Sequence, residues 1–253
     1  PPPREEASRL MRIVSLCPSI TESLVALGLG GRLVGVTRYC VHPREALEGI
    51  ARVGGTKNPD HEAIARLAPD LVLCNAEENR APDVEALSRR HRVDVSHPRR
   101  VADVPPLLRR FGALTGKETH AEGWARAVEE RLAAARPSGP VRFAYLVWKG
   151  PWMAAAGGTY ISDLLETFGG VNVFPAGNGD WPETDEERLA ALDPDLLVLP
   201  DEPYRFGEAD RDGWAVKLPR ARIALVSGDD FCWHGVRTVR GLEAAERLLA
   251  GAP

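Results

Sequence analysis

The sequence predicts an α/β fold of two Rossmann-like lobes, each with a mainly parallel central sheet, joined by a single long α-helix. Short apolar runs alternate with helical segments, a pattern typical of βαβ units. The stretch 67–73 recurs as a near copy at 192–198. A helix-forming segment at 118–136 lies between the two copies. The expected domains are an N-terminal lobe at 10–115, a connecting helix at 116–136 and a C-terminal lobe at 137–253.

The first half of the chain shows the βαβ pattern clearly. The apolar run 12–17 predicts a strand that Pro18 ends. Ser19 and Glu22 have the spacing of a capping box, which predicts a helix from Ser19 that stops at Gly28. The next expected elements are a strand at 33–37, a short helix at 60–67 and a strand at 71–74.

The second half repeats this plan after a helical middle. A helix is expected at 103–115 and another at 118–136, which would span about 28 Å and form a rigid strut. The expected elements that follow are a strand at 141–147, a helix at 160–168, a short helix at 186–192 and a strand at 196–199. The middle lacks the composition of a flexible Gly/Ser linker, which favours rigid joining of the lobes.

Composition excludes several classes of protein. The 253 residues carry a net charge of -4, and no basic stripe is present, which argues against a nucleic-acid or anionic-membrane partner. The four cysteines form no CxxC pair, so neither a disulfide scaffold nor a zinc ribbon is expected. No apolar run reaches the length of a membrane span, and the printed chain shows no signal peptide.

Several motifs follow one another in a characteristic order. They are the run 12–22, Leu27-Gly28, the strand 33–37, the repeat 67–73 and the stretch 163–174. This order resembles the helical-backbone metal-receptor superfamily, the class III substrate-binding proteins of ABC importers, and most closely its vitamin B12-binding branch. The resemblance implies a monomeric binding protein, not an enzyme, that clasps a metal-bearing small molecule between two lobes and delivers it to the membrane subunits of an importer.

The same resemblance implies the ligand and the compartment. Cobalamin or another corrinoid is expected first and a ferric siderophore second, with no cofactor required and a bound metal ion left open. An extracytoplasmic location is implied, while the lack of a signal peptide in the printed chain leaves the cytoplasm open. The alternatives are an intracellular corrinoid or metal-ion chaperone and, further off, a hydrolase or transferase. No nucleophile elbow, HExxH or P-loop supports the enzyme.

Aromatic residues are scarce but cluster in loops near predicted strand ends. Ligands of α/β sheets bind outside the carboxyl ends of strands, and flat side chains there suit a planar ligand such as a corrin ring. The alternative is that several of them only cover the core. The expected ligand contacts are Tyr39, Cys40, His42, Trp148, Trp152, Trp181, Asp230, Trp233, His234 and Arg237.

Two Cys-x-His triplets stand out, Cys40-Val41-His42 and Cys232-Trp233-His234. In extended backbone, residues i and i+2 share a face, so Cys40, His42, Cys232 and His234 could form a Cys2His2 set suited to zinc. The alternative is buried cysteines whose neighbouring histidines bond to nearby loops.

Two further pairs of charged residues carry expectations. Arg237 and Asp230 can anchor amide or phosphate groups of a ligand. The alternative is that they form a surface salt bridge. Glu62 and Glu187 occupy matching places in the two short repeat helices. The resemblance implies that these two glutamates dock on arginines of the importer's membrane subunits.

Overall fold

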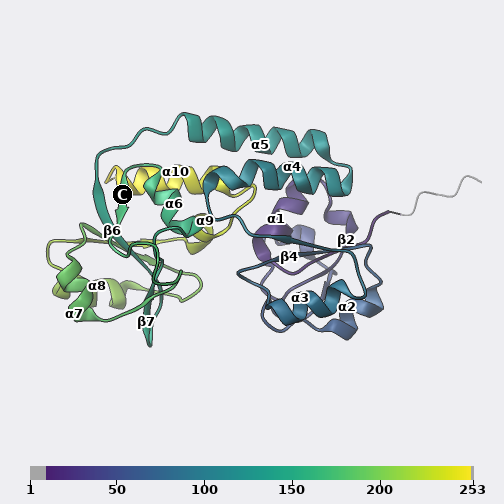
Figure 1. Ribbon diagram of the computed structural model, residues 1–253, viewed down its shortest axis with the longest axis horizontal. Coiled ribbons are helices and arrows are strands. Elements are labelled where there is room, and N and C mark those ends of the chain that lie inside the picture. The colour runs from purple at the N-terminus through teal and green to yellow at the C-terminus, as the bar shows by residue number, and fades with distance from the viewer. Residues whose placement is uncertain (1–9, 252–253) are drawn as a thin grey trace, which may run out of the picture. The chain divides into compact units, whose positions relative to one another are not determined.

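The computed structural model describes residues 10–251, which fold into two compact units (Figure 1). Unit 1 holds the described residues up to 97 together with 105–125, and unit 2 holds 98–104 together with the described residues from 126 onward. Helix α5 (Glu118–Ala133) belongs to unit 1 through Ala125 and to unit 2 from Arg126. Within the described range, no helix is both long and apolar enough to cross a membrane.

Unit 1 is built on a five-stranded sheet in which every pairing is parallel, in the order β3-β2-β1-β4-β5. Alternate strand residues face opposite sides. Ile13 and Leu73 pack with α1 and α4 on one face, and Val14 and Val72 pack with α2 and α3 on the other. The elements are β1 (Ile13–Ser15), α1 (Pro18–Ala26), β2 (Leu33–Val36), β3 (Ala51–Arg52), α2 (His61–Leu67), β4 (Leu71–Asn75), α3 (Ala81–Ser88), β5 (Val93–Ser96) and α4 (Val104–Thr115), with 3-10 turns η1 (Gly30–Arg32) and η2 (Glu45–Leu47).

Unit 2 has a six-stranded sheet in the order β11-β10-β6-β7-β9, with β8 also pairing β6. The pairings among β6, β8, β10 and β11 are parallel, and those of β7 are antiparallel. The two mainly parallel sheets predicted from the sequence are therefore confirmed. The elements are η3 (Val101–Asp103), β6 (Val141–Trp148), β7 (Trp152–Ala154), α6 (Tyr160–Glu166), β8 (Gly170–Asn172), β9 (Glu183–Thr184), α7 (Glu186–Leu192), β10 (Leu196–Pro200), α8 (Glu208–Lys217), β11 (Arg222–Val226), α9 (Gly228–Cys232) and α10 (Thr238–Leu249).

The first copy of the sequence repeat forms a latch at the end of α2. Ala68 adopts the left-handed conformation (φ 42°), which ends the helix. Arg12 then donates two hydrogen bonds to the carbonyl oxygen of Leu67, at 3.0 and 2.8 Å, and its own amide donates to Asp70 at 2.7 Å. The latch joins the entry of β1 to the turn that leads into β4.

The second copy repeats the latch at the end of α7, with one arginine hydrogen bond in place of two. Asp193 is left-handed (φ 45°), Arg142 donates to the carbonyl of Leu192 at 2.6 Å, and the Arg142 amide donates to Asp195 at 2.8 Å. The similarity seen between 67–73 and 192–198 is thus a repeat of structure as well as of sequence. It supports a plan of two related units.

The start of α1 differs from the expectation. The helix begins at Pro18 and its cap residue is Cys17, so the predicted capping box at Ser19 is wrong. Proline is favoured at the first helical position because its fixed φ suits the helix and its missing N–H costs no hydrogen bond there. Gly28 follows the helix with φ 76°, as expected of a C′ glycine.

Tyr145 gives a test of packing in unit 2. Its ring lies 5.9 Å from that of Phe231, and its buried hydroxyl has no hydrogen-bond partner among the described residues. Because an orphaned polar group costs desolvation without return, Tyr145→Phe should raise the free energy of unfolding by about 1 kcal/mol. Denaturant unfolding measures this change.

The matched control is Tyr160, which is also buried but bonds the hydroxyl of Thr238 at 2.8 Å. Tyr160→Phe should lower the free energy of unfolding by about 1 kcal/mol, because it removes one partner of a buried hydrogen bond. Equal losses from both substitutions would show that the Tyr145 hydroxyl is hydrogen-bonded in solution.

Candidate functional site

In unit 1 the loop that follows β2 carries Tyr39, one of the predicted ligand contacts. Its side chain is exposed, and the guanidinium of Arg38 lies 5.9 Å from the ring centroid. The loop begins at the carboxyl end of a parallel strand, where α/β proteins bind ligands. Tyr39 therefore lies where a ligand contact was expected, with its ring available to solvent.

Cys40 and His42 occupy different environments, although they are two residues apart. The Cys40 thiol is fully buried and lies 3.1 Å from the hydroxyls of both Thr21 and Thr37. Burial raises its pKa, which disfavours the thiolate needed for metal binding. His42 is exposed. The first triplet thus does not present sulfur and nitrogen together, because the Cys40 thiol lies in the core and His42 is exposed.

The same buried thiol has a clear structural role. Arg52 donates hydrogen bonds to the carbonyl oxygens of Thr37, at 3.1 Å, and Cys40, at 2.8 Å. Together with the two threonine contacts, these bonds hold both ends of the segment that presents Tyr39. Cys40 accordingly fixes the loop from inside the core.

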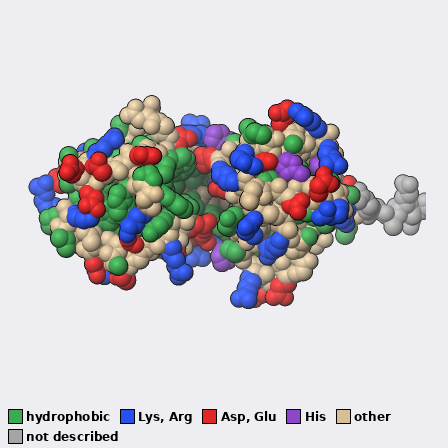
Figure 2. Space-filling model, turned by 90° about the horizontal axis from the view of Figure 1, so that it is seen from below, with side chains coloured by type: hydrophobic (Ala, Val, Ile, Leu, Met, Phe, Trp, Pro, Cys, Tyr) green, Lys and Arg blue, Asp and Glu red, His purple; other side chains and the backbone are tan. Residues whose placement is uncertain are grey.

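Unit 2 carries a continuous series of aromatic side chains, which we call the aromatic series. It runs from the buried Trp214 through Trp152 and Phe206 to Tyr204 and the exposed Trp148. Successive ring centroids lie 5.1, 6.1, 4.7 and 5.6 Å apart, all within the range of favourable aromatic contact. Figure 2 shows hydrophobic side chains gathered on the viewed face of unit 2, at the left.

The aromatic series is anchored in the core at one end and open at the other. Trp148 ends β6, and Tyr204 follows β10 by a few residues, so the open end lies beside the carboxyl ends of two neighbouring parallel strands. Lys149 supports the middle, with its ammonium 2.6 Å from Asp210 and 5.4 Å from the ring centroid of Trp152. The exposed ring of Trp148 thus belongs to a series whose other rings are buried or half-buried.

Trp181 is a second exposed aromatic residue of unit 2. It lies two residues before the start of β9, and its neighbour Pro182 accepts a hydrogen bond from the amide of Ala154 in β7 at 3.0 Å. Trp148 and Trp181, both predicted ligand contacts, are therefore exposed, while Trp152 is partly covered within the aromatic series.

The second Cys-x-His triplet lies at the end of α9. Trp233 and His234 are almost fully buried, and Cys232 is half-buried. The guanidinium of Arg237 lies 4.9 Å from the Trp233 ring, and the ring of Tyr160 meets that of His234 edge to face. These side chains contribute to packing around α9 and α10 in this structure.

Asp230 and Arg237 contact each other. Asp230 accepts from Arg237 at 3.1 Å and from Arg240 at 3.0 Å, and Asp229 lies 3.8 Å from Arg237. The network ties α9 to α10. Asp230 and Arg237 were expected to be either ligand anchors or part of a surface salt bridge, and the geometry favours a salt bridge. Both side chains are buried, so the salt bridge does not lie at the surface.

The metal site predicted from the two triplets has no cluster to support it in residues 10–251. No three His, Cys, Asp or Glu side chains of that range are grouped as metal ligands. The buried, hydrogen-bonded thiol of Cys40 gives one physical reason.

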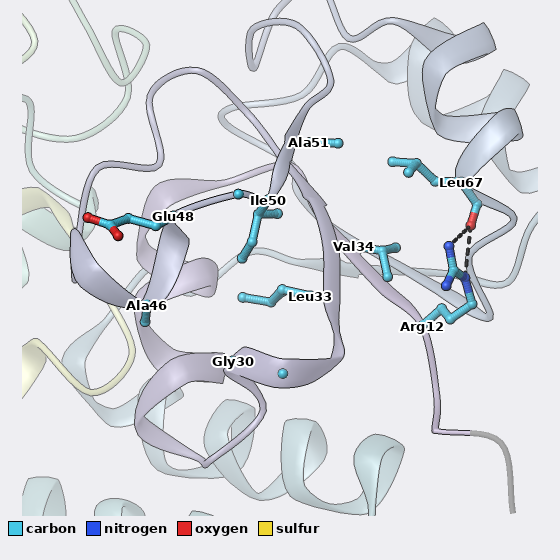
Figure 3. Close-up of a pocket in the computed structure, with 11 residues that line it drawn as sticks. Arg12, Gly30, Leu33, Val34, Ala46, Glu48, Ile50, Ala51 and Leu67 are labelled. Atoms are coloured by element: carbon cyan, nitrogen blue, oxygen red, sulfur yellow. Dashed lines mark hydrogen bonds between the residues drawn. The ribbon is translucent and has the colours of Figure 1, made fainter.

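Unit 1 also contains an open cavity of about 660 Å³, shown in Figure 3. Its lining includes Leu33 at the start of β2, Ala51 at the start of β3, and Arg12, whose hydrogen bonds to Leu67 are drawn. It lies at the amino ends of the strands. Because ligands of parallel sheets bind at the carboxyl ends, this cavity is not the candidate ligand site.

Tyr204, one of the loop aromatics that the sequence places just after an apolar strand, belongs to the aromatic series. An ion pair beside the site was not predicted. Arg99 forms a two-bonded ion pair with Asp180, next to Trp181. No local sequence signal connects residues that are 81 positions apart.

Each unit carries an exposed aromatic residue, Tyr39 or Trp148, beside the carboxyl end of a parallel strand, where α/β proteins bind ligands. A comparison with protein families gives the class of the protein. The family described as "Periplasmic binding protein" matches residues 13–211, and the chain belongs to this family. It is a class III substrate-binding protein of the ABC-importer type, which implies a small-molecule ligand and membrane ABC subunits as partners.

Curated relatives match over nearly the whole chain. The vitamin B12-binding protein of Vibrio cholerae serotype O1 is 26% identical over 94% of this chain and 87% of its own length. That of Vibrio parahaemolyticus serotype O3:K6 is 28% identical over 92% of this chain and 86% of its own length.

Solved structures share the fold. The periplasmic vitamin B12-binding protein BtuF of Vibrio cholerae matches with a TM-score of 0.82 at 22% identity, covering 94% of this chain and 96% of its own. The apo periplasmic haem-binding protein RhuT of Roseiflexus sp. RS-1 also reaches 0.82, at 23% identity, covering 96% of this chain and 100% of its own. The predicted α/β architecture is thereby confirmed.

Proposed function

We propose that this protein binds a corrinoid such as cobalamin and delivers it to an ABC importer. The observation that carries the proposal is the aromatic series, whose rings end in the half-buried Tyr204 and the exposed Trp148 beside the carboxyl ends of β10 and β6. The curated relatives named above are vitamin B12-binding proteins, which supports the same ligand.

The chemistry of the exposed residues suits a large planar chelate. Tyr39, Trp148 and Trp181 offer broad ring faces at low conformational cost, and stacking on such faces is effective for flat, partly apolar ligands. A small polar solute would instead need converging hydrogen-bond donors and acceptors. The corrin ring with its amide rim matches the first description.

Titration of the purified protein tests the proposal. Cyanocobalamin, cobinamide, haemin and a ferric siderophore are added separately, while tryptophan fluorescence and the absorption spectrum of each ligand are followed. The expected result is saturable quenching with cyanocobalamin or cobinamide at a one-to-one ratio. Failure of both corrinoids to bind would overturn the proposal.

Haem is the second candidate, and Tyr39 is the observation that favours it. An exposed phenol at the carboxyl end of a strand can serve as an axial ligand of ferric haem, as tyrosine does in catalase. If haemin binds, Tyr39→Phe should abolish the tyrosinate charge-transfer band, whereas corrinoid binding should change little on loss of the hydroxyl. The two ligands are thus distinguished by one substitution.

We also propose that Glu62 and Glu187 dock on the importer, since α2 and α7 are equivalent helices of the two repeat copies. Both side chains are exposed, and Glu62 is contacted by Arg90 at 3.2 Å. Opposite charges at a docking surface speed association, so Glu62→Lys with Glu187→Lys should weaken importer binding about tenfold or more at low salt. Pull-down with the membrane subunits in nanodiscs measures the effect.

The matched control for docking is Glu85→Lys on α3, which reverses another exposed glutamate of unit 1. It should leave importer binding unchanged, and all three variants should keep the wild-type ligand affinity. If Glu85→Lys weakens importer binding equally, the loss of binding comes from the change in net charge and not from a defined docking surface.

A further inference from the structure

Trp181 follows a loop, 175–180, whose middle, 177–179, has little packing of its own. Its residues are exposed except for the half-buried Asp180. Gly177 and Gly179 adopt left-handed conformations, with φ of 113° and 84°, and a side chain at either position would meet no atom within 4 Å. Such a segment has few contacts to hold one conformation.

A two-bonded ion pair fastens the end of this loop. Arg99 donates from Nη1 to Asp180 Oδ2 at 2.6 Å and from Nη2 to Oδ1 at 2.7 Å. This fork geometry fixes direction as well as distance, which a single charge contact cannot do. The carbonyl of Asp180 also accepts from the Ala156 amide at 2.9 Å. The residue that follows the fork is Trp181.

Arg99 is itself held in place within unit 2. Its amide donates to Asp103 at 3.0 Å, and the amide of Val101, in the same 3-10 turn, donates to Asp163 of α6 at 2.7 Å. The 3-10 turn that follows Arg99 is thus attached to a helix of the unit. The guanidinium therefore starts from a fixed backbone.

Two glycines leave room for this arrangement. A Cβ on Gly157 would lie 2.9 Å from the backbone nitrogen of Ala176 in the loop, and one on Gly158 would lie 3.8 Å from Nη2 of Arg99. The loop therefore packs closely on the 157–158 backbone, beside the guanidinium. The start of the loop, at Ala176, packs on this backbone, and its end, at Asp180, is held by Arg99.

We infer that the Arg99–Asp180 pair is a positioning device that orders the loop 175–180 and thereby fixes Trp181 for ligand contact. This role deepens the proposed function and rests on it. Neither Arg99 nor Asp180 needs to contact the ligand. A ligand that contacts an already ordered Trp181 does not have to order the loop 175–180 on binding, which would cost affinity.

The test combines hydrogen exchange with ligand titration for Arg99→Ala. Exchange at the Ala156 amide, whose acceptor is the Asp180 carbonyl, should become about tenfold faster, because local opening becomes easier. The Kd for cyanocobalamin should rise about 3- to 10-fold, which corresponds to the free-energy cost of ordering one side chain at a binding surface. Stability should change little, because an ion pair at this exposure contributes weakly.

Two further variants separate positioning from mere loss of charge. Arg99→Lys keeps the charge but lacks the fork, so it should recover only part of the affinity. The charge-swap double variant, Arg99→Asp with Asp180→Arg, restores a pair of opposite charges. It should bring the hydrogen-exchange rate of the Ala156 amide back toward the wild-type value. If the Ala156 amide of this double variant exchanges hydrogen as fast as that of Arg99→Ala, the ion pair does not order the loop.

The matched control is Arg109→Ala in unit 1. Arg109 and Glu122 form a similar fork at 2.7 and 3.2 Å, with side-chain exposures of 40% and 38% against 34% and 36% for Arg99 and Asp180. Its loss should alter neither the Ala156 exchange rate nor the Kd. An equal rise in Kd would show that any such pair matters and would contradict the inference.

The remaining outcomes are distinct. Unchanged exchange at Ala156 in Arg99→Ala overturns the inference, and so does faster exchange with an unchanged Kd. If the wild-type protein binds none of the tested ligands, the proposed function fails. The exchange rates then still decide whether the fork orders the loop.

Discussion

Trp148→Ala and Trp181→Ala should each raise the Kd for cyanocobalamin about 10- to 30-fold. Interface aromatics that become buried against a ligand are the usual energetic centres of binding, and truncating one commonly costs about 2 kcal/mol. Both side chains are exposed in the protein without ligand, so the surface they would bury is available to a ligand. The fluorescence titration described above measures the change directly.

The affinity loss should occur without unfolding. Trp148 meets only the edge of Tyr204 at 5.6 Å in the aromatic series, so its removal should cost about 1 kcal/mol of stability or less. A suitable control is Val171→Ala, because Val171 is 44% exposed against 43% for Trp148 but lies at the opposite end of the unit 2 sheet. If Val171→Ala weakens binding as much as Trp148→Ala, the aromatic series is not the ligand surface.

Much of the fold followed from local sequence patterns. The helix α7 was predicted with the bounds that the structure shows, since Asp185 caps it and the left-handed Asp193 ends it. The repeat of Leu-x-Pro-Asp predicted the two equivalent units, and the Arg12 and Arg142 latches give its physical basis. The pattern failed at Ser19, where a proline one position earlier fixed the start of the helix instead.

The candidate site was harder to predict, because burial depends on tertiary packing. Tyr39, Trp148 and Trp181 are exposed, but Trp233 has the same residue type as the last two and is buried beneath the guanidinium of Arg237. Cys40 lies in a loop, yet its thiol bonds to two threonines in the core. Periodicity identifies a loop, and it does not show which of the loop's side chains turn inward.

Asp230→Ala should lower the free energy of unfolding by about 3 kcal/mol. The carboxylate is 8% exposed, and its partner Arg237 is 9% exposed. Removing one side of a buried ion pair leaves the other charge desolvated without compensation, which typically costs 3–5 kcal/mol. The lower end applies here because Asp229, at 3.8 Å, can still approach Arg237. Urea unfolding followed by circular dichroism measures it.

Arg240→Ala is the matched control, because Arg240 bonds the same carboxylate from a side chain that is 65% exposed. It should cost less than about 1 kcal/mol, since water replaces an exposed partner and Asp230 keeps Arg237. A cost below 1 kcal/mol for Asp230→Ala as well would mean that the network is solvated.

The same substitutions decide between the two roles that the sequence allowed for Asp230. If Asp230 anchors the ligand, Asp230→Asn should weaken cyanocobalamin binding at temperatures where the variant is fully folded, although the side chain keeps its shape. The geometry predicts the opposite, because both carboxylate oxygens already accept from arginines of the same unit. Stability should therefore fall with Asp230→Asn while the Kd stays within about twofold of wild type, since the charge serves the joint between α9 and α10.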